Sequence, residues 1–154
     1  MFRRPTVQTL DLPDAPTRQA FGRLTLSTVP RSMTEITDAV AGWLAGTGIR
    51  AGLLTLFLRH TSASLVIQEN ADPDVQADLL DAFDRLAPAN AGYRHGIEGA
   101  DDMPAHVKTA LTGVSLGIPV TGGRMDLGTW QGIYLFEHRA RPHERSVTLH
   151  LLGA

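Results

Sequence analysis

The spacing of apolar residues along the chain predicts a protein built mainly from short β-strands. Residues 21–28 alternate between apolar and polar side chains, which is typical of a strand with one buried face. The run from Gly52 to His60 is apolar at most positions, so we expect a strand that is buried on both faces. The Gly122-Gly123 pair predicts a hairpin turn. Further segments with strand-like patterns are residues 62–68, 114–120, 124–127, 129–138 and 146–152.

Three segments have the capping signals and apolar spacing of helices. Residues Ser32–Glu35 match a capping box, which predicts that a helix begins there and ends near Gly48. Asp72 followed by Pro73 predicts the start of a second helix. Asp is a good N-cap, and Pro is tolerated at the first helical position because the backbone N–H that it lacks would have no partner inside the helix. A third, shorter helix is expected after the polar stretch 89–102, with Asp101 or Asp102 as its cap.

The order of these segments predicts the fold class. Strands cluster in the middle and at both ends of the chain without regular β-α-β alternation, which favours an antiparallel layout over a doubly wound parallel sheet. We therefore expect an α+β fold, a β-rich antiparallel sandwich with about three flanking helices. Residues 21–154 are predicted to form a single domain, and residues 1–20 an N-terminal extension.

Composition removes several classes of function. The net charge of −2 does not suit a protein that binds nucleic acid through its backbone phosphates. The chain has no cysteine, which excludes disulfides, thiolate ligands and cysteine nucleophiles. No apolar run approaches the length of a membrane span, and the N-terminal residues lack the apolar core of a signal peptide. We therefore expect no nucleic-acid or membrane partner and a cytoplasmic location.

Two groups of histidines are candidates for chemistry. His60 follows a predicted strand and is flanked by small hydroxyl residues, so it is either a ligand or acid–base group or a hydrogen-bonded residue at the rim. His95 and His106 flank Glu98, Asp101 and Asp102 within a dozen residues of a loop-to-helix junction. Imidazole and carboxylate are the usual ligands of a catalytic zinc ion, but the spacing matches no known zinc motif. A capped helix with surface histidines explains the same residues equally well.

Two other stretches contain polar residues close to strand ends. Glu69 and Asn70 precede the cap of the second predicted helix, so capping does not account for them. In residues 128–139, alternation puts Trp130, Tyr134, Phe136 and His138 on one face and Gln131, Ile133, Leu135 and Glu137 on the other. Such an aromatic stripe is more often core than binding site. The arginines and histidine that follow, at 139, 141, 143 and 145, form a basic turn that either binds an anion or is simply solvated.

Four long motifs, taken together and in order, resemble the YjbQ-like family of small bacterial and archaeal proteins. They are HTSASLVIQENADPDV from His60, YRHGIEGADDMPAHVK from Tyr93, SLGIPVTGGR from Ser115 and LGTWQGIYLFEHR from Leu127. The resemblance implies a homotrimeric, compact β-rich sandwich. It also implies a weak thiamine-phosphate synthase activity, in which a pyrimidine diphosphate loses pyrophosphate and joins a thiazole phosphate.

The resemblance also implies roles for individual residues. His60, His95 and His106 are expected to bind a divalent metal, zinc above all, with Mg²⁺ accompanying a diphosphate substrate as a further expectation. The expected catalytic residues are Glu69, Asn70, Glu98 and Gln131, and those expected to bind a small phosphorylated molecule are Arg94, Lys108, Arg124, Trp130 and Arg139. Three functions stay open at this point: a metal-assisted transferase, a metal-dependent hydrolase that uses Glu98 as base, and a non-catalytic trimer that binds a metal or small ligand.

Overall fold

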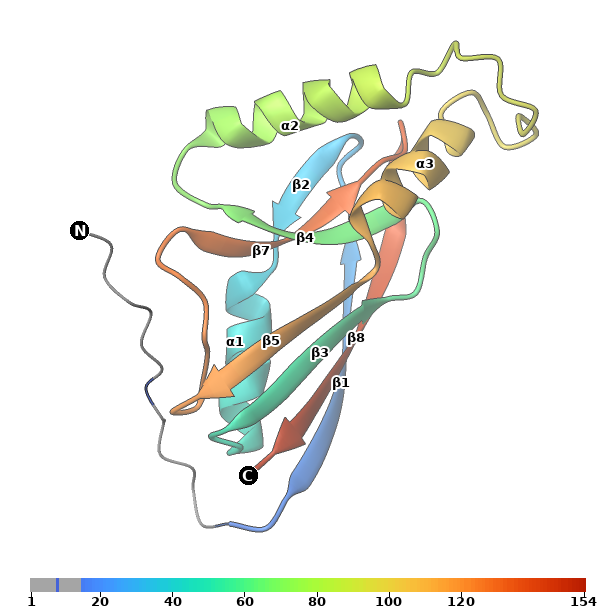
Figure 1. Ribbon diagram of the computed structural model, residues 1–154. Helices are drawn as coiled ribbons and strands as arrows, with labels where there is room; N and C mark the ends of the chain where they lie inside the picture. The colour runs from blue at the N-terminus through green and yellow to red at the C-terminus, as the bar shows by residue number, and fades with distance from the viewer. Residues whose placement is uncertain (1–7, 9–14) are drawn as a thin grey trace.

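A computed structural model of the chain describes residue 8 and residues 15–154, which form two antiparallel sheets and three helices (Figure 1). The expected α+β class and its antiparallel sheets are confirmed. Most of the predicted N-terminal extension, residues 1–7 and 9–14, lies outside the described part of the chain. Residues 18–20 of that extension already belong to the first strand.

The larger sheet has five strands in the order β1-β8-β3-β5-β6. At its centre β3 pairs with both β8 and β5. The turn between β5 and β6 contains Gly122 and Gly123 with φ of 56° and 79°, and this left-handed pair confirms the predicted hairpin. The strands are β1 (Arg18–Ser27), β3 (Gly52–Leu58), β5 (Ser115–Thr121), β6 (Arg124–Met125) and β8 (Glu144–Gly153).

The smaller sheet has three strands in the order β2-β7-β4, and it corrects one prediction. Residues Ser32–Glu35 form strand β2, not the start of a helix. They pair with β7 (Gln131–Glu137), and Ser32 lies opposite Glu137. On the other side of β7, β4 (Ala63–Glu69) runs antiparallel along its full length. The capping-box pattern was a chance match, because cross-strand pairing satisfies the backbone groups that the box would have capped.

The three helices lie on different parts of this framework. Helix α1 (Thr37–Thr47) begins two residues after β2, and no side chain caps its first turn. Helix α2 (Pro73–Leu86) starts as predicted, with Asp72 Oδ1 accepting a hydrogen bond of 2.9 Å from the Asp74 amide. Helix α3 (Asp102–Thr112) lies beside β4 (Figure 1). None of the helices formed by the described residues is long and apolar enough to cross a membrane.

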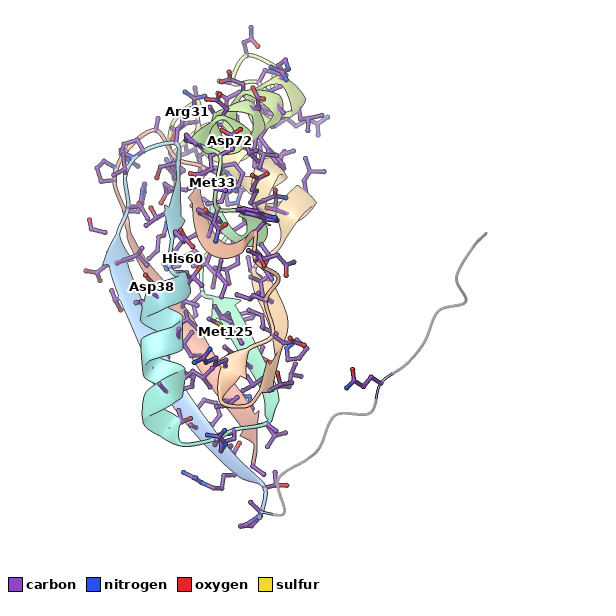
Figure 2. The ribbon with its side chains drawn as sticks, turned by 90° about the vertical axis from the view of Figure 1, so that its left-hand side faces the viewer. Arg31, Met33, Asp38, His60, Asp72 and Met125 are labelled. Carbon is purple, nitrogen blue, oxygen red and sulfur yellow. The ribbon has the colours of Figure 1, made fainter. Side chains whose placement is uncertain are left out.

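Two apolar clusters hold the layers together. The main core lies between the two sheets and helix α1, and combines side chains such as Leu56, Leu149 and Leu135. The second lies on the opposite face of the small sheet, where Tyr134 and Phe136 pack against helix α2. Strand β7 is therefore buried on both faces, in the alternation that the sequence predicts. Figure 2 shows the length of the molecule, with Met33 of β2 near the α2 end and Met125 of β6 toward the other.

The outer face of the large sheet is less covered than the apolar run in β3 predicts. Leu54, Leu56 and Leu58 are buried as expected, but Leu53 and Phe57 are each about half exposed, at 50% and 49%. The prediction that this strand is buried on both faces is therefore wrong for the single chain. An antiparallel strand needs only one covered face, and the sequence pattern did not reveal which face of β3 would be left partly exposed.

Candidate metal centre at the start of helix α3

Two histidines and one aspartate come together where the loop after α2 enters helix α3. His95 Nε2 lies 2.7 Å from Asp102 Oδ2, and His106 Nε2 lies 3.3 Å from the same oxygen. Asp102 and His106 are four residues apart on α3 and so share one helix face, while His95 reaches them from the loop. All three ligand atoms lie within 4.8 Å of one another.

The hydrogen bonds of His106 determine which of its nitrogens faces the cluster as a free acceptor. Its Nδ1 lies 2.8 Å from the carbonyl oxygen of Thr61. A carbonyl only accepts, so Nδ1 carries a proton, and a neutral ring in this orientation presents its lone pair at Nε2. That lone pair faces the Asp102 carboxylate, which is another acceptor. Only a proton or a metal cation at Nε2 makes this contact attractive, and a backbone carbonyl on the second nitrogen is the usual support of a metal-binding histidine.

Arg139 holds the Asp102 carboxylate in place from the side away from the histidines. Its Nη1 lies 2.6 Å from Asp102 Oδ1, and its Nε donates to Asp101 Oδ2 over 2.8 Å. Burial raises the pKa of Asp102, but the hydrogen bond from His95 and the charge of Arg139 outweigh it, so the pKa lies below its usual range. Asp102 is thus a carboxylate with one oxygen paired to Arg139 and the other available to the histidines.

The donor set fits a zinc ion in its chemistry and approximately in its spacing. Two imidazole nitrogens and one carboxylate oxygen are a typical catalytic zinc set, which leaves the fourth tetrahedral position open. Bonds of about 2.0–2.1 Å place tetrahedral ligand atoms about 3.3 Å apart. The 3.3 Å pair of His106 and Asp102 already has that separation. The pair of His95 and Asp102, at 2.7 Å, would open slightly, and the half-exposed His95 side chain has room to move.

His60, the third predicted ligand, lies outside this group of ligand atoms. Its Nε2 accepts a hydrogen bond of 2.9 Å from the backbone amide of Ser146. That nitrogen already uses its lone pair in a hydrogen bond with strand β8 and is not free to bind a metal ion. His60 nonetheless lines a cavity of about 550 Å³ together with His106 and Thr61. Figure 2 shows His60 at mid-height in the molecule, below Met33 and above Met125.

The remaining predicted residues near α3 differ in accessibility. Arg139 is only 3% exposed and is occupied by Asp101, Asp102 and the Glu98 carbonyl. Lys108 is also buried, and its Nζ pairs with Asp84 of α2. Glu98 is exposed at the edge of the cluster, with its carboxylate 3.8 Å from Arg139. Arg94 is exposed on the loop between α2 and α3.

The other predicted residues gather at the opposite end of the small sheet. Glu69 at the end of β4 lies opposite Gln131 at the start of β7. The backbone N–H of Asn70 donates to the backbone carbonyl of Trp130, and Gln131 lines the same cavity as Arg124. Since β4 begins near the histidines and has seven residues, roughly 20 Å separates the two groups. In Figure 1 the turn from β4 into α2 and helix α3 lie on opposite sides of the small sheet.

The structure changes the interpretation of three residues. Asp102 was noted only as an acid or helix cap, although its spacing from His106 was a readable signal. Arg139 and Arg145, expected in a basic turn, are both buried, and Arg145 pairs with the fully buried Glu137 at 2.6 Å. Asp101 lies 38 residues before Arg139 in the sequence, whereas Glu137 lies only eight residues before Arg145.

The comparisons with known proteins agree on one family. Residues 22–154 match the model described as UPF0047 protein YjbQ-like. The UPF0047 protein sll1880 of Synechocystis is 50% identical over 131 residues, which cover 84% of this chain and 89% of that protein. The protein YugU of Bacillus subtilis is 39% identical over 121 residues, 79% of this chain and 89% of its own length. A crystal structure of an uncharacterised conserved protein of the same family from Clostridium acetobutylicum superposes with a TM-score of 0.78 at 36% identity, covering 84% of this chain and 98% of that one.

Proposed function

This chain belongs to the UPF0047 (YjbQ-like) family, and we propose that it binds a divalent metal ion, zinc by preference, through His95, Asp102 and His106. The observation that carries the proposal is the orientation of His106. Its Nδ1–H donates to the Thr61 carbonyl, and its Nε2 lone pair meets a carboxylate that Arg139 holds from behind. A cation between these two acceptors removes their repulsion.

The ligand types favour zinc over magnesium. Magnesium prefers an octahedral set of oxygen ligands and retains several waters, whereas two imidazole nitrogens suit zinc. The expected Mg²⁺ would therefore enter only with a diphosphate substrate, not as the resident ion. The metal set differs from the predicted one in a single member, since Asp102 takes the place of His60.

We propose that the site serves hydrolysis of small phosphorylated molecules. A bound zinc ion with an open position supplies an acidified water and a Lewis acid. The chain's own residues orient that site: Thr61 fixes the ring of His106, Arg139 fixes Asp102, and the exposed Glu98, whose carboxylate lies 3.8 Å from Arg139, is the proposed base. The transferase alternative also needs an aromatic surface for the pyrimidine: Trp130 lies roughly 20 Å away within one chain, whereas Tyr93 is two residues before His95 in the sequence.

Metal analysis of protein purified without a histidine tag tests the proposal. After removal of metals by a chelator and addition of zinc, the wild type is expected to retain about one ion per chain. His95→Ala, Asp102→Asn and His106→Ala are each expected to weaken zinc binding by more than tenfold. His150→Ala is the matched control, because this histidine stacks on Phe21 away from the cluster. A folded wild type that binds no zinc, or variants that bind as well as the control, would overturn the proposal.

A product assay then separates the two enzyme hypotheses. Hydrolysis releases inorganic phosphate from a simple phosphate monoester such as p-nitrophenyl phosphate. The transferase releases pyrophosphate only when a pyrimidine diphosphate and a thiazole phosphate are both present. Phosphate release by the zinc-loaded wild type that is lost in Asp102→Asn supports the hydrolase. Pyrophosphate release without phosphate release would favour the transferase over the hydrolase.

A further inference from the structure

A cavity of about 550 Å³ between the end of β3 and helix α3 has a lining that is apolar and cationic. Arg59 and His60 line it, and none of the described residues around it carries a carboxylate. Its apolar surface comes from Phe57, Leu58, Ala110 and Val114. This combination suits an anion that carries an apolar body.

The cavity is separate from the proposed metal centre, although His106 lies beside both. Neither His95 nor Asp102 lines it. The Nδ1 of His106 donates to the Thr61 carbonyl over 2.8 Å, and its Nε2 lies 3.3 Å from Asp102 Oδ2. Both nitrogens are therefore engaged, and His106 contributes surface to the cavity but no free donor.

The imidazole of His60 extends the pairing of β3 with β8 beyond the last backbone pair. The Arg59 amide donates to the Ser146 carbonyl over 3.1 Å, and the Ser146 amide donates over 2.9 Å to His60 Nε2. The ring thus occupies the place of a backbone carbonyl, and the sheet fixes its orientation. Burial, and next the charge of Arg145, lower the pKa of His60, so the ring is neutral at pH 7. Because Nε2 accepts, the proton of this neutral ring is on Nδ1.

Two neighbouring donors at this cavity therefore have no acceptor. Among the residues that the structure describes, the His60 Nδ1–H has no hydrogen-bond partner, and it is not one of the fully enclosed polar atoms. The Arg59 side chain is exposed and forms no ion pair within the same part of the chain. One N–H with a fixed direction and one guanidinium are thus available to a ligand.

We propose that this cavity binds a monocarboxylate with an apolar body, whose two oxygens accept from the His60 Nδ1–H and from Arg59. Two donors match the two oxygens of a carboxylate. A phosphate dianion is usually held by the free N–H groups at a helix N-terminus or in a backbone nest. Helix α3 meets this cavity at residues 106–110, beyond its first turn, where the backbone N–H groups already bond within the helix. The apolar body lies against Leu58 and Val114.

Calorimetric titration of chelator-treated protein with phenylacetate, phenylacetamide and phenyl phosphate tests this proposal on the wild type. We expect phenylacetate to bind about tenfold or more tightly than the neutral amide, since both donors then meet a charged acceptor. We also expect it to bind more tightly than phenyl phosphate. The proposal is overturned if phenylacetate does not bind, if the amide binds as tightly, or if phenyl phosphate binds more tightly. No metal is present in these titrations, so their result is independent of the proposed zinc site.

Substitutions then test the two donors, with urea unfolding as the check that each variant is folded. His60→Met has no N–H and should weaken phenylacetate binding by about tenfold or more. His60→Asn places an amide N–H near the position of Nδ1 and should remain within about threefold of the wild type. Equal affinities of folded His60→Met and the wild type, or equal losses in Met and Asn, would contradict the role of His60.

The contribution of Arg59 is expected to be smaller, because its side chain is exposed to solvent. Arg59→Gln should weaken phenylacetate binding by about two- to fivefold and reduce the effect of added salt on the affinity. Arg50→Gln is the matched control, since Arg50 precedes β3 and Arg59 follows it at the other end. An Arg59→Gln protein that binds like the wild type, or a control that loses as much affinity, would contradict the role of Arg59.

Discussion

Acidification is expected to destabilise this protein through one buried histidine, His138. The ring is only 3% exposed, its Nε2 lies 2.9 Å from Ser64 Oγ, and its Nδ1 has no partner among the described residues. Burial, and next the charge of Lys108, lower the pKa of His138 to about 3. A second proton would have to enter a site with no acceptor for it, so the folded state keeps the ring neutral.

The size of the effect follows from the difference between the folded and unfolded pKa values. A histidine in the unfolded chain titrates near 6.5, so between about pH 6.5 and pH 3 the unfolded state binds a proton that the folded state does not. The free energy of unfolding therefore falls as the pH falls through this window. Between pH 7 and pH 5 the loss from His138 alone is about 2 kcal/mol.

Urea unfolding of chelator-treated protein at pH 7 and pH 5, at one protein concentration, measures this loss. His138→Gln is the matched variant, since its amide can still reach Ser64 but does not titrate. The wild type is expected to lose about 2 kcal/mol more than His138→Gln between the two pH values, because all other titrating groups are common to both. Equal losses in the two proteins would refute the reasoning and show that the folded ring accepts a proton readily.

Three further predictions concern packing and assembly. Glu137→Gln removes the charge that neutralises buried Arg145 and should cost about 3–5 kcal/mol in urea unfolding, and a loss below 1 kcal/mol would contradict the pairing. Gly52→Ala should destabilise by about 1–3 kcal/mol or more, because a Cβ there would lie 2.1 Å from a backbone oxygen of β8. Gly42→Ala in α1, with nothing within 4 Å, should instead stabilise by roughly 0.5–1 kcal/mol, and the same sign for both glycines would contradict this account. We propose that the chain forms the homotrimer that the family resemblance implies: light scattering should then give three times the chain mass, and Phe57→Glu should lower that mass if the exposed face of the large sheet is the contact.

Features encoded by neighbouring residues could be predicted well from the sequence. The start of α2 depends on Asp72 and Pro73, and the β5–β6 turn on two adjacent glycines, so both signals lie within a few positions. The alternation of β7 was also correct, because its two faces meet two different apolar layers. Residues Ser32–Glu35 show the opposite case. Their local pattern favours a helix start, but pairing with a strand about a hundred residues later decides the outcome.

The residues of the candidate site likewise differ in how far the sequence alone could predict their contacts. Asp102 and His106 are one helical turn apart, so their approach follows from the helix alone. The contributions of Thr61 and Arg139 depend on how β4 and β7 place their ends beside α3, and no spacing in the sequence reports that. The sequence predicted His60 to be a polar site residue, but only the structure shows that its Nε2 accepts a hydrogen bond from the Ser146 backbone N–H.

The position of β8 between β1 and β3 has a consequence for the order of events during synthesis. Among the described residues β1 pairs with β8 alone, so this pairing must wait until residues 144–153 have been made. At 5–20 residues per second the wait is roughly 10 s. During that time β3, β5 and β6 can already pair with one another, whereas the small sheet must also wait, because both β2 and β4 pair with β7 at residues 131–137. Ribosome-bound chains that stop before Glu144 are therefore expected to leave β1 accessible to chaperones and proteases.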